Sequence, residues 1–205
     1  MGTRMKLKHN TKSRRAAQGG FSLIEVIIAI AVMSIGLLAV VASIGMAVKA
    51  TASAQEDLVA RQKALEALES IYTARNSQQV PFTSINNTAS GGIFLSGPQN
   101  LLCAGPDGLV GTGDDVACKT SGGVTCPHGG VECWVLPGPD GILGTADDET
   151  YSLYNFKRTI TFNQVLLSTG LVNSNMMAVT VSVTYTKDGI PARTYTVSGL
   201  ISQYN

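Results

Sequence analysis

Residues 20–49 of the 205-residue chain read GFSLIEVIIAIAVMSIGLLAVVASIGMAVK, and the interior of this apolar stretch contains a single ionisable residue, Glu25. A helix from Phe21 to Val48 would be roughly 42 Å long at about 1.5 Å per residue, which exceeds the ~30 Å hydrocarbon core of a bilayer. A core helix of a soluble domain would carry a polar stripe, whereas only serines are otherwise clearly polar here. The stretch therefore predicts a membrane-spanning helix over residues 21–48.

The residues before this stretch form a basic leader, 1–20, that ends in a glycine pair. Of the 15 Lys and Arg residues of the chain, six lie in the leader, which leaves 9 against 14 Asp and Glu and a net charge of −5. By the positive-inside bias, the leader stays in the cytoplasm and the C-terminal bulk is translocated. A secretory signal has the same charge pattern, but its cleavage site follows a short apolar run. Here the glycine pair precedes the apolar run, so the helix would be kept.

The glycine pair, then Phe21, then a glutamate at the fifth position counted from Phe21 resemble the signature shared by type IV pilins and type II secretion pseudopilins. The resemblance covers roughly residues 14–49. It implies that prepilin peptidase, a membrane aspartic peptidase, cuts after Gly20 and that the new terminus, Phe21, is N-methylated. It also implies that the Glu25 carboxylate, which is costly in lipid unless paired, neutralises the terminal amine of an adjacent subunit during assembly. The alternative is a Glu25 that lies at the water interface without a role.

Helical character continues over residues 49–76, but the surface becomes polar. No proline occurs between Phe21 and Val80, which predicts one helix of about 55 residues ending near Asn76. This amphipathic continuation favours docking on a sheet over a free coiled coil, because the pattern lasts fewer than three heptads. Its apolar stripe is expected at Leu58, Leu65, Leu68 and Tyr72.

Residues 77–150 are rich in Gly, Pro, Asn and Ser, which predicts a loop-rich insertion. It contains an internal repeat, since residues 105–115 read GPDGLVGTGDD and residues 138–148 read GPDGILGTADD. Oxygen-rich loops with glycine at the bends suit Ca²⁺, and some pseudopilins resemble this region in holding structural calcium in an acidic loop. The alternative is a pair of tight turns with solvated acids. The candidate calcium ligands are Asp107, Asp114, Asp115, Asp140, Asp147 and Asp148.

The insertion also holds all four cysteines of the chain, which are Cys103, Cys118, Cys126 and Cys133. In a translocated domain, an even number of clustered cysteines favours disulfides over free thiols. Three pairings are open, and the sequential pairing closes the smallest loops. The spacing contains no CxxC motif, which argues against a zinc site.

The C-terminal segment, residues 151–205, has the alternating pattern of half-buried strands over residues 151–162 and 177–187. Asp188-Gly189 supplies a hairpin turn, and residues 192–202 supply the return strand. We therefore expect an α+β fold, in which a long N-terminal helix packs on a small C-terminal antiparallel sheet. The disulfide-bearing, loop-rich insertion lies between them in sequence.

The sequence contains no constellation of catalytic residues, so we expect a structural protein and not an enzyme, with no cofactor other than structural Ca²⁺. The second half of the helix and the closing strand are similar to PilV-type minor pilins and I-type type II secretion pseudopilins. This similarity implies a subunit, of the minor class, of a type IV pilus or a type II secretion pseudopilus. Such a subunit crosses the inner membrane once, has a periplasmic C-terminal domain, and enters the pilus or pseudopilus with other pilin or pseudopilin subunits.

The alternative function is that of a surface adhesin, which would bind through the acidic, disulfide-bearing loops. Nucleic acid is not expected as a partner, because a net charge of −5 without the leader argues against a broad basic patch.

Overall fold

The structure is a computed structural model that describes residues 20–187 and 190–204. The chain divides into two compact units, Met1–Ala50 and Thr51–Asn205. The leader up to Gly19 and the expected turn at Asp188-Gly189 lie outside the described residues.

One helix, α1 (Leu23–Asn76), begins in the first unit and is 54 residues long, close to the length expected from the sequence. It starts after Ser22, whose hydroxyl accepts a hydrogen bond from the Ile24 N–H at 3.3 Å and whose carbonyl accepts one from the Glu25 N–H at 3.1 Å. These bonds satisfy N–H groups that the first turn of a helix leaves without partners. Among the described helices, α1 alone is long and apolar enough to cross a bilayer.

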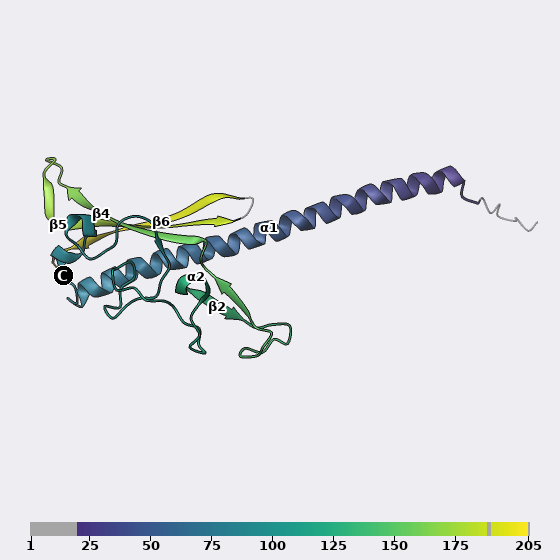
Figure 1. The fold of residues 1–205 in the computed structure, drawn as a ribbon. Coiled ribbons are helices and arrows are strands. Elements are labelled where there is room, and N and C mark those ends of the chain that lie inside the picture. Colours follow the sequence, from purple (N-terminus) through teal and green to yellow (C-terminus); the bar gives the residue numbers. More distant parts are fainter. Residues whose placement is uncertain (1–19, 188–189, 205) are drawn as a thin grey trace, which may run out of the picture. The chain divides into compact units, whose positions relative to one another are not determined.

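The second unit is built on a four-stranded sheet with the order β1-β4-β5-β6, in which all neighbours are antiparallel. A two-stranded antiparallel sheet, β2-β3, lies apart from it in the hydrogen-bonding pattern. The strands are β1 (Gln99–Asn100), β2 (Cys133–Leu136), β3 (Glu149–Ser152), β4 (Phe156–Leu166), β5 (Val172–Lys187) and β6 (Ile190–Ser202). Figure 1 shows the C-terminal half of α1 lying along the larger sheet, which confirms the α+β fold expected from the sequence.

The face of α1 that packs on the sheet differs from the expected stripe. Leu58 and Leu65 are exposed, whereas Ala60, Ala64 and Ala67 are fully buried. The reason is close approach: an alanine stripe spaced by three or four residues brings the helix backbone near the strands, and a leucine there would overpack the core. The buried face continues through Leu68 and Ile71.

The strands supply the other half of the core through every second residue. Val179, Val181 and Val183 of β5 are fully buried, while hydroxyl side chains alternate with them on the outer face. One close contact requires a glycine, because a Cβ on Gly199 would lie 2.0 Å from the Tyr72 hydroxyl oxygen of α1. The helix and β6 therefore meet at a distance that larger residues would not allow.

The first expected strand, residues 151–162, is wrong in its boundaries. It is divided between β3 and β4 by a turn in which the Phe156 N–H donates to the Leu153 carbonyl at 2.9 Å. Both residues are fully buried. The turn between β3 and β4 therefore lets Leu153 and Phe156 pack in the same core. The other expected strands are present but longer, as β5 and β6.

The insertion consists of short elements joined by loops, as expected. It contains two 3-10 turns, η1 (Phe82–Ser84) and η2 (Thr88–Ser90), the short helix α2 (Pro127–Gly130) and the β2–β3 hairpin. The first acidic repeat precedes α2, and the second forms the loop between β2 and β3.

Candidate functional site

The predicted processing residues lie at the exposed start of α1. Gly20 and Phe21 precede the helix in irregular backbone, and Phe21 is 82% exposed. Glu25 lies in the first turn, where a carboxylate is favoured by the positive end of the helix dipole. The structure therefore places Gly20, Phe21 and Glu25 within one short segment. It contains no second subunit, so their roles in cleavage, methylation and assembly stay predictions.

The apolar side chains of the first unit have no cover within that unit. Every described residue from Gly20 to Ala50 is exposed, including the large side chains at Leu23, Met33 and Leu38. An exposed apolar surface of this extent marks a membrane or protein contact. The exposed apolar surface of this helix is therefore suited to a lipid or protein contact.

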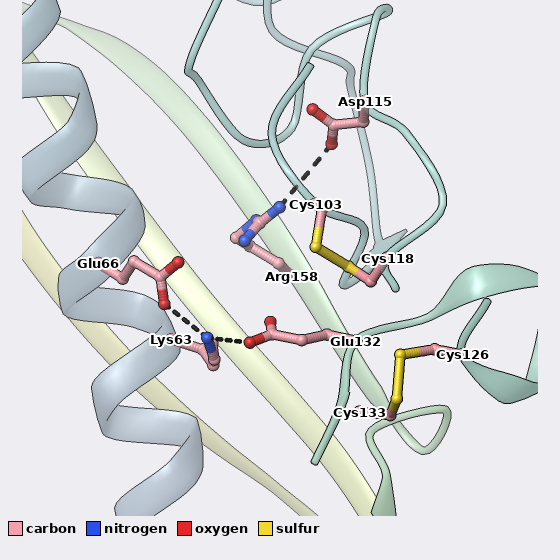
Figure 2. Close-up of a disulfide and its surroundings, with 9 residues drawn as sticks. All are labelled: Lys63, Glu66, Cys103, Asp115, Cys118, Cys126, Glu132, Cys133 and Arg158. Atoms are coloured by element: carbon pink, nitrogen blue, oxygen red, sulfur yellow. Dashed lines mark hydrogen bonds and ion pairs between the residues drawn. A yellow bond between two sulfur atoms is a disulfide. The ribbon is translucent and has the colours of Figure 1, made fainter. Parts of the chain in front are cut away.

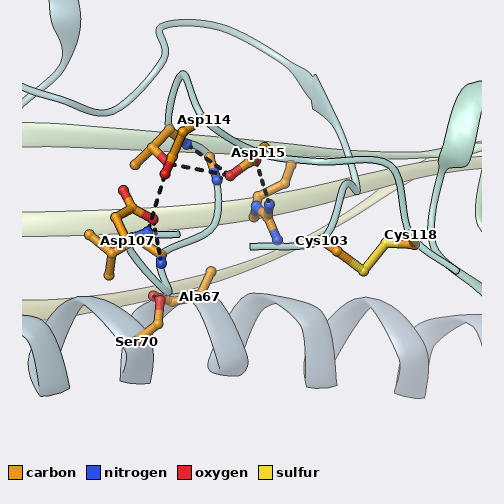
Figure 3. Close-up of polar contacts among 11 residues, drawn as sticks. Ala67, Ser70, Cys103, Asp107, Asp114, Asp115 and Cys118 are labelled. Carbon is orange, nitrogen blue, oxygen red and sulfur yellow. Dashed lines mark hydrogen bonds and ion pairs between the residues drawn. A yellow bond between two sulfur atoms is a disulfide. The ribbon is translucent and has the colours of Figure 1, made fainter. Parts of the chain in front are cut away.

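The first acidic repeat forms a loop whose aspartates accept hydrogen bonds from the loop itself (Figure 3). The Leu109 N–H donates to Asp107 at 2.8 Å, and the Thr112 hydroxyl donates to Asp114 at 2.7 Å. Asp115 accepts a bond from the Gly111 N–H at 2.8 Å. The hydroxyl of Thr112 lowers the pKa of Asp114.

The second repeat reproduces this hydrogen-bond set 33 residues later. The Ile142 N–H donates to Asp140 at 2.8 Å, the Thr145 hydroxyl donates to Asp147 at 2.7 Å, and the Gly144 N–H donates to Asp148 at 2.6 Å. The Thr145 hydroxyl likewise lowers the pKa of Asp147. The repeated sequence thus forms one loop conformation twice. In each loop, aspartate carboxylates accept hydrogen bonds from loop N–H groups that a backbone carbonyl would otherwise accept.

The two loops differ in their surroundings. Leu109 and Val110 of the first loop are buried in the core, whereas their counterparts Ile142 and Leu143 are exposed. Asp115 also lies 3.9 Å from the Arg158 guanidinium of β4. The first loop is therefore part of the folded body, and the second presents its apolar pair to solvent.

The structure does not bring the six aspartates together as one ligand set. Among residues 20–187 and 190–204, no three His, Cys, Asp or Glu side chains are grouped in a way that suits a metal ion. Three aspartates belong to each loop, and their hydrogen bonds stabilise the loop on its own. Calcium binding stays an untested prediction.

The four cysteines form two disulfides, Cys103–Cys118 and Cys126–Cys133, which is the sequential pairing (Figure 2). The first disulfide encloses the whole first repeat, and the second joins α2 to the start of β2. Together they fix the loops of the insertion, which have few strand contacts of their own.

A cluster of charges that are mostly buried or half-buried, missed in the sequence, connects α1, the insertion and the sheet. Lys63 of α1 forms ion pairs with Glu66, at 2.7 Å, and with Glu132 of the insertion (Figure 2). Burial alone would lower the pKa of Lys63, but the hydrogen bonds to both glutamates raise it overall. Arg158 is 2% exposed, and burial lowers its pKa while the charge of Asp115 opposes this shift. Burial in turn raises the pKa of Asp115.

A signal for this cluster was present in the alternation of β4. Phe156, Arg158 and Ile160 occupy positions of the same parity, so an inward Phe156 places Arg158 inward as well. A buried arginine requires an acid, and the sequence pattern does not say which one.

Residues 15–41 match the family model described as the prokaryotic N-terminal methylation motif. Comparison of the chain with curated proteins and with solved structures found no match. The matched segment contains Gly20, Phe21, Glu25 and the start of α1, and it is followed by the rest of α1, an insertion with two disulfides, and a small antiparallel sheet. The chain therefore has the N-terminal methylation motif typical of type IV pilin-like proteins, on a helix that is long and apolar enough to cross a membrane.

Proposed function

We propose that the protein is a structural subunit of a type IV pilus or of a type II secretion pseudopilus. Prepilin peptidase cuts it after Gly20, Phe21 is methylated, and the subunit assembles with other pilin or pseudopilin subunits through the apolar part of α1. The observation that carries this proposal is the methylation motif on a helix whose first 28 residues are exposed and apolar apart from Glu25, Lys49 and a few hydroxyl or small residues.

Assembly moves this helix from lipid to a bundle of helices, and in both places a lone carboxylate is costly. After cleavage, the Phe21 amine is a cation at the same depth as Glu25. Neutralisation of that amine by the Glu25 carboxylate of a neighbouring subunit removes two unfavourable charges in one contact. The same pairing fixes the axial position of one helix against the next.

Glu25→Ala tests this proposal in cells that make the filament. We expect the variant to be cleaved and folded but absent from filaments recovered from the cell surface or from the secretion complex. Ser34→Ala is a matched control, since Ser34 lies on the same apolar helix and its hydroxyl is satisfied by the Ile30 carbonyl at 2.8 Å. Normal incorporation of the Glu25 variant would overturn the proposed role of this residue.

The finer placement also belongs to this proposal. The subunit is of the minor class and resides first in the inner membrane, in a single pass with its second unit in the periplasm. The second candidate function, adhesion through the acidic loops, is favoured by the exposed pair Ile142 and Leu143 of the second repeat. Replacement of both residues by serine should then abolish adhesion while incorporation into filaments stays normal.

A further inference from the structure

The β4–β5 hairpin ends in an exposed apolar tip, here called the finger (residues 165–172). Four of its side chains, Leu166, Leu167, Leu171 and Val172, are 47–68% exposed. The turn is closed by bonds from the Leu167 N–H to the Leu171 carbonyl and from the Gly170 N–H to the Leu167 carbonyl. A β-bulge between Gln164 and Val165 precedes it and changes the direction of the hairpin.

The finger is also uncharged over a long distance. No Asp, Glu, Lys, Arg or His occurs between Arg158 and Lys187. Covering a surface tip of this composition with an apolar site is favourable in free energy, because apolar surface is removed from water. The tip itself has no charge that would have to be desolvated. Within the described residues of the second unit, about half or more of the surface of each of these four side chains stays exposed.

The second unit also carries an apolar groove of about 380 Å³. It lies between α1 and the β2–β3 hairpin. Six of its eight lining residues are Ala52, Leu58 and Val59 of α1 and Trp134, Leu136 and Tyr151 of the hairpin, and Gln55 and Glu56 of α1 are the two polar ones. A cavity of ~150 Å³ is enough to hold benzene, so this groove has room for two leucine side chains.

The finger and the groove lie at opposite ends of the second unit. At one end, Arg75 of α1 donates to the Ser202 carbonyl at 2.6 Å, and the Gln203 N–H donates to Asn175 at the base of the finger. Figure 1 shows the β4–β5 hairpin beside the C-terminal end of α1. At the other end, Asp57 accepts bonds from Tyr185 at 2.6 Å and from Arg193 at 2.8 Å.

The groove lies at the second of these ends, near Asp57, because its α1 residues lie between 52 and 59. The 18 helical residues from Asp57 to Arg75 correspond to about 27 Å along α1. A finger therefore cannot fill the groove of its own chain, whereas it can fill that of another copy.

We propose that the finger of one copy inserts into the groove of the next copy in the filament. On the side of α1, the groove begins at Ala52, near the start of the part of the helix that belongs to the second unit. A finger at one end of the unit and a groove at the other form a heterologous contact between two copies. A chain of such contacts always has a free finger at one end and a free groove at the other, so it can propagate as an open filament. This inference rests on the proposed function, since assembly sets copies side by side.

Cross-linking between two differently tagged full-length copies tests the contact in cells that make the filament. One copy carries Leu171→Cys and the other carries Leu136→Cys. The four native cysteines are all in disulfides, so the new thiols are the reactive ones. We expect a bifunctional thiol reagent to link the mixed pair into a covalent dimer and to leave the Leu171→Cys copies unlinked to each other.

Ile142→Cys paired with Leu136→Cys is the matched control, because Ile142 is an apolar residue of similar exposure on another loop. Dimer yields no greater than in this control, or links mainly between two Leu171→Cys copies, would overturn the proposal. The second outcome would indicate a finger-to-finger contact. A finger that inserts in a lipid surface would likewise give no mixed dimer.

Incorporation of the same copies into filaments separates this inference from the proposed function. Copies that incorporate normally but give no mixed dimer overturn the finger contact alone, whereas copies that never incorporate overturn both. A Leu166→Ser, Leu171→Ser variant, altered only at exposed positions, should fold normally and lose the finger contact. A positive result would also show that at least two copies of this subunit are adjacent in the filament.

Discussion

The Asp115→Ala variant measures how much the ion pair between Asp115 and Arg158 of β4 contributes to the stability of the fold. The side chains of Arg158 and Asp115 are 2% and 7% exposed, and 3.9 Å separates Nη2 from Oδ2. Within the part of the chain that the structure describes, Nε and Nη2 of Arg158 have no hydrogen-bond acceptor. Removal of one partner of a buried pair costs about 3–5 kcal/mol. Because 3.9 Å is long for an ion pair, we expect a loss near the lower limit, about 3 kcal/mol.

Asp148→Ala is the matched control, since Asp148 occupies the same position in the second repeat. It accepts the equivalent backbone bond, from Gly144 at 2.6 Å, and no arginine pairs with it among the described residues. Loss of such a bond costs about 1 kcal/mol. The difference between the two variants, about 2 kcal/mol, is the part that depends on Arg158.

Thermal unfolding of the full-length chain in detergent, followed by the fluorescence of Trp134, provides the measurement. For a chain of this size, 1 kcal/mol shifts Tm by about 2–4 °C, so Asp115→Ala should lower Tm by roughly 6–12 °C and Asp148→Ala by roughly 2–4 °C. Arg158→Met added to Asp115→Ala should recover most of the loss, because no buried charge is then left alone. Equal losses in the two single variants would refute the reasoning.

Three further measurements address the loops. Thr112→Val should raise the pKa of Asp114 in an NMR titration, because the native hydrogen bond from Thr112 lowers this pKa. The stability that this bond contributes to the fold is present above the ordinary carboxyl pKa. It is lost as the pH falls through the lowered pKa of Asp114. An unchanged pKa would contradict this role of the hydroxyl. Removal of the Cys103–Cys118 disulfide should lower the free energy of unfolding by about 3 kcal/mol. Removal of the Cys126–Cys133 disulfide should lower it somewhat less, because this disulfide closes a shorter loop and restricts the unfolded chain less. A larger loss for the second disulfide in denaturant unfolding would contradict this entropic explanation. If the loops bind calcium, Tm should rise between chelator and millimolar Ca²⁺ by mass action, and an unchanged Tm would rule calcium out as a structural ligand.

The features that the sequence predicted correctly depend on short stretches of chain. The length of α1 and its apolar first half follow from the absence of proline and from composition. The order of helix, loop-rich insertion and antiparallel sheet follows from the change of period along the chain. Each of these signals is complete within a few turns or strands, so no tertiary contact is needed to interpret it.

The features that were missed depend on which faces meet. The leucines at positions 58 and 65 satisfy a helical stripe as well as the alanines at 60, 64 and 67 do, and hydrophobicity alone favours the leucines. The contact of Tyr72 with β6 requires a small residue at Gly199, and this requirement appears only when two segments far apart in the sequence are in contact. The pairing of Lys63 with Glu132 has the same origin, because the sequence shows the charges without their partners.

The two acidic repeats separate what local sequence determines from what the fold adds. The two loops share these hydrogen bonds because both have the aspartates, the threonine and the first three glycines at the same spacing. The first loop is enclosed by the Cys103–Cys118 disulfide, and its Leu109 reaches the core; the second is held only at the end of the β2–β3 hairpin, and its Ile142 stays in solvent. A loop of fixed conformation can therefore serve as core in one place and as accessible surface in another. This difference makes the second repeat the part of the insertion that can be altered without loss of the fold, and so the part in which contacts specific to this subunit can arise.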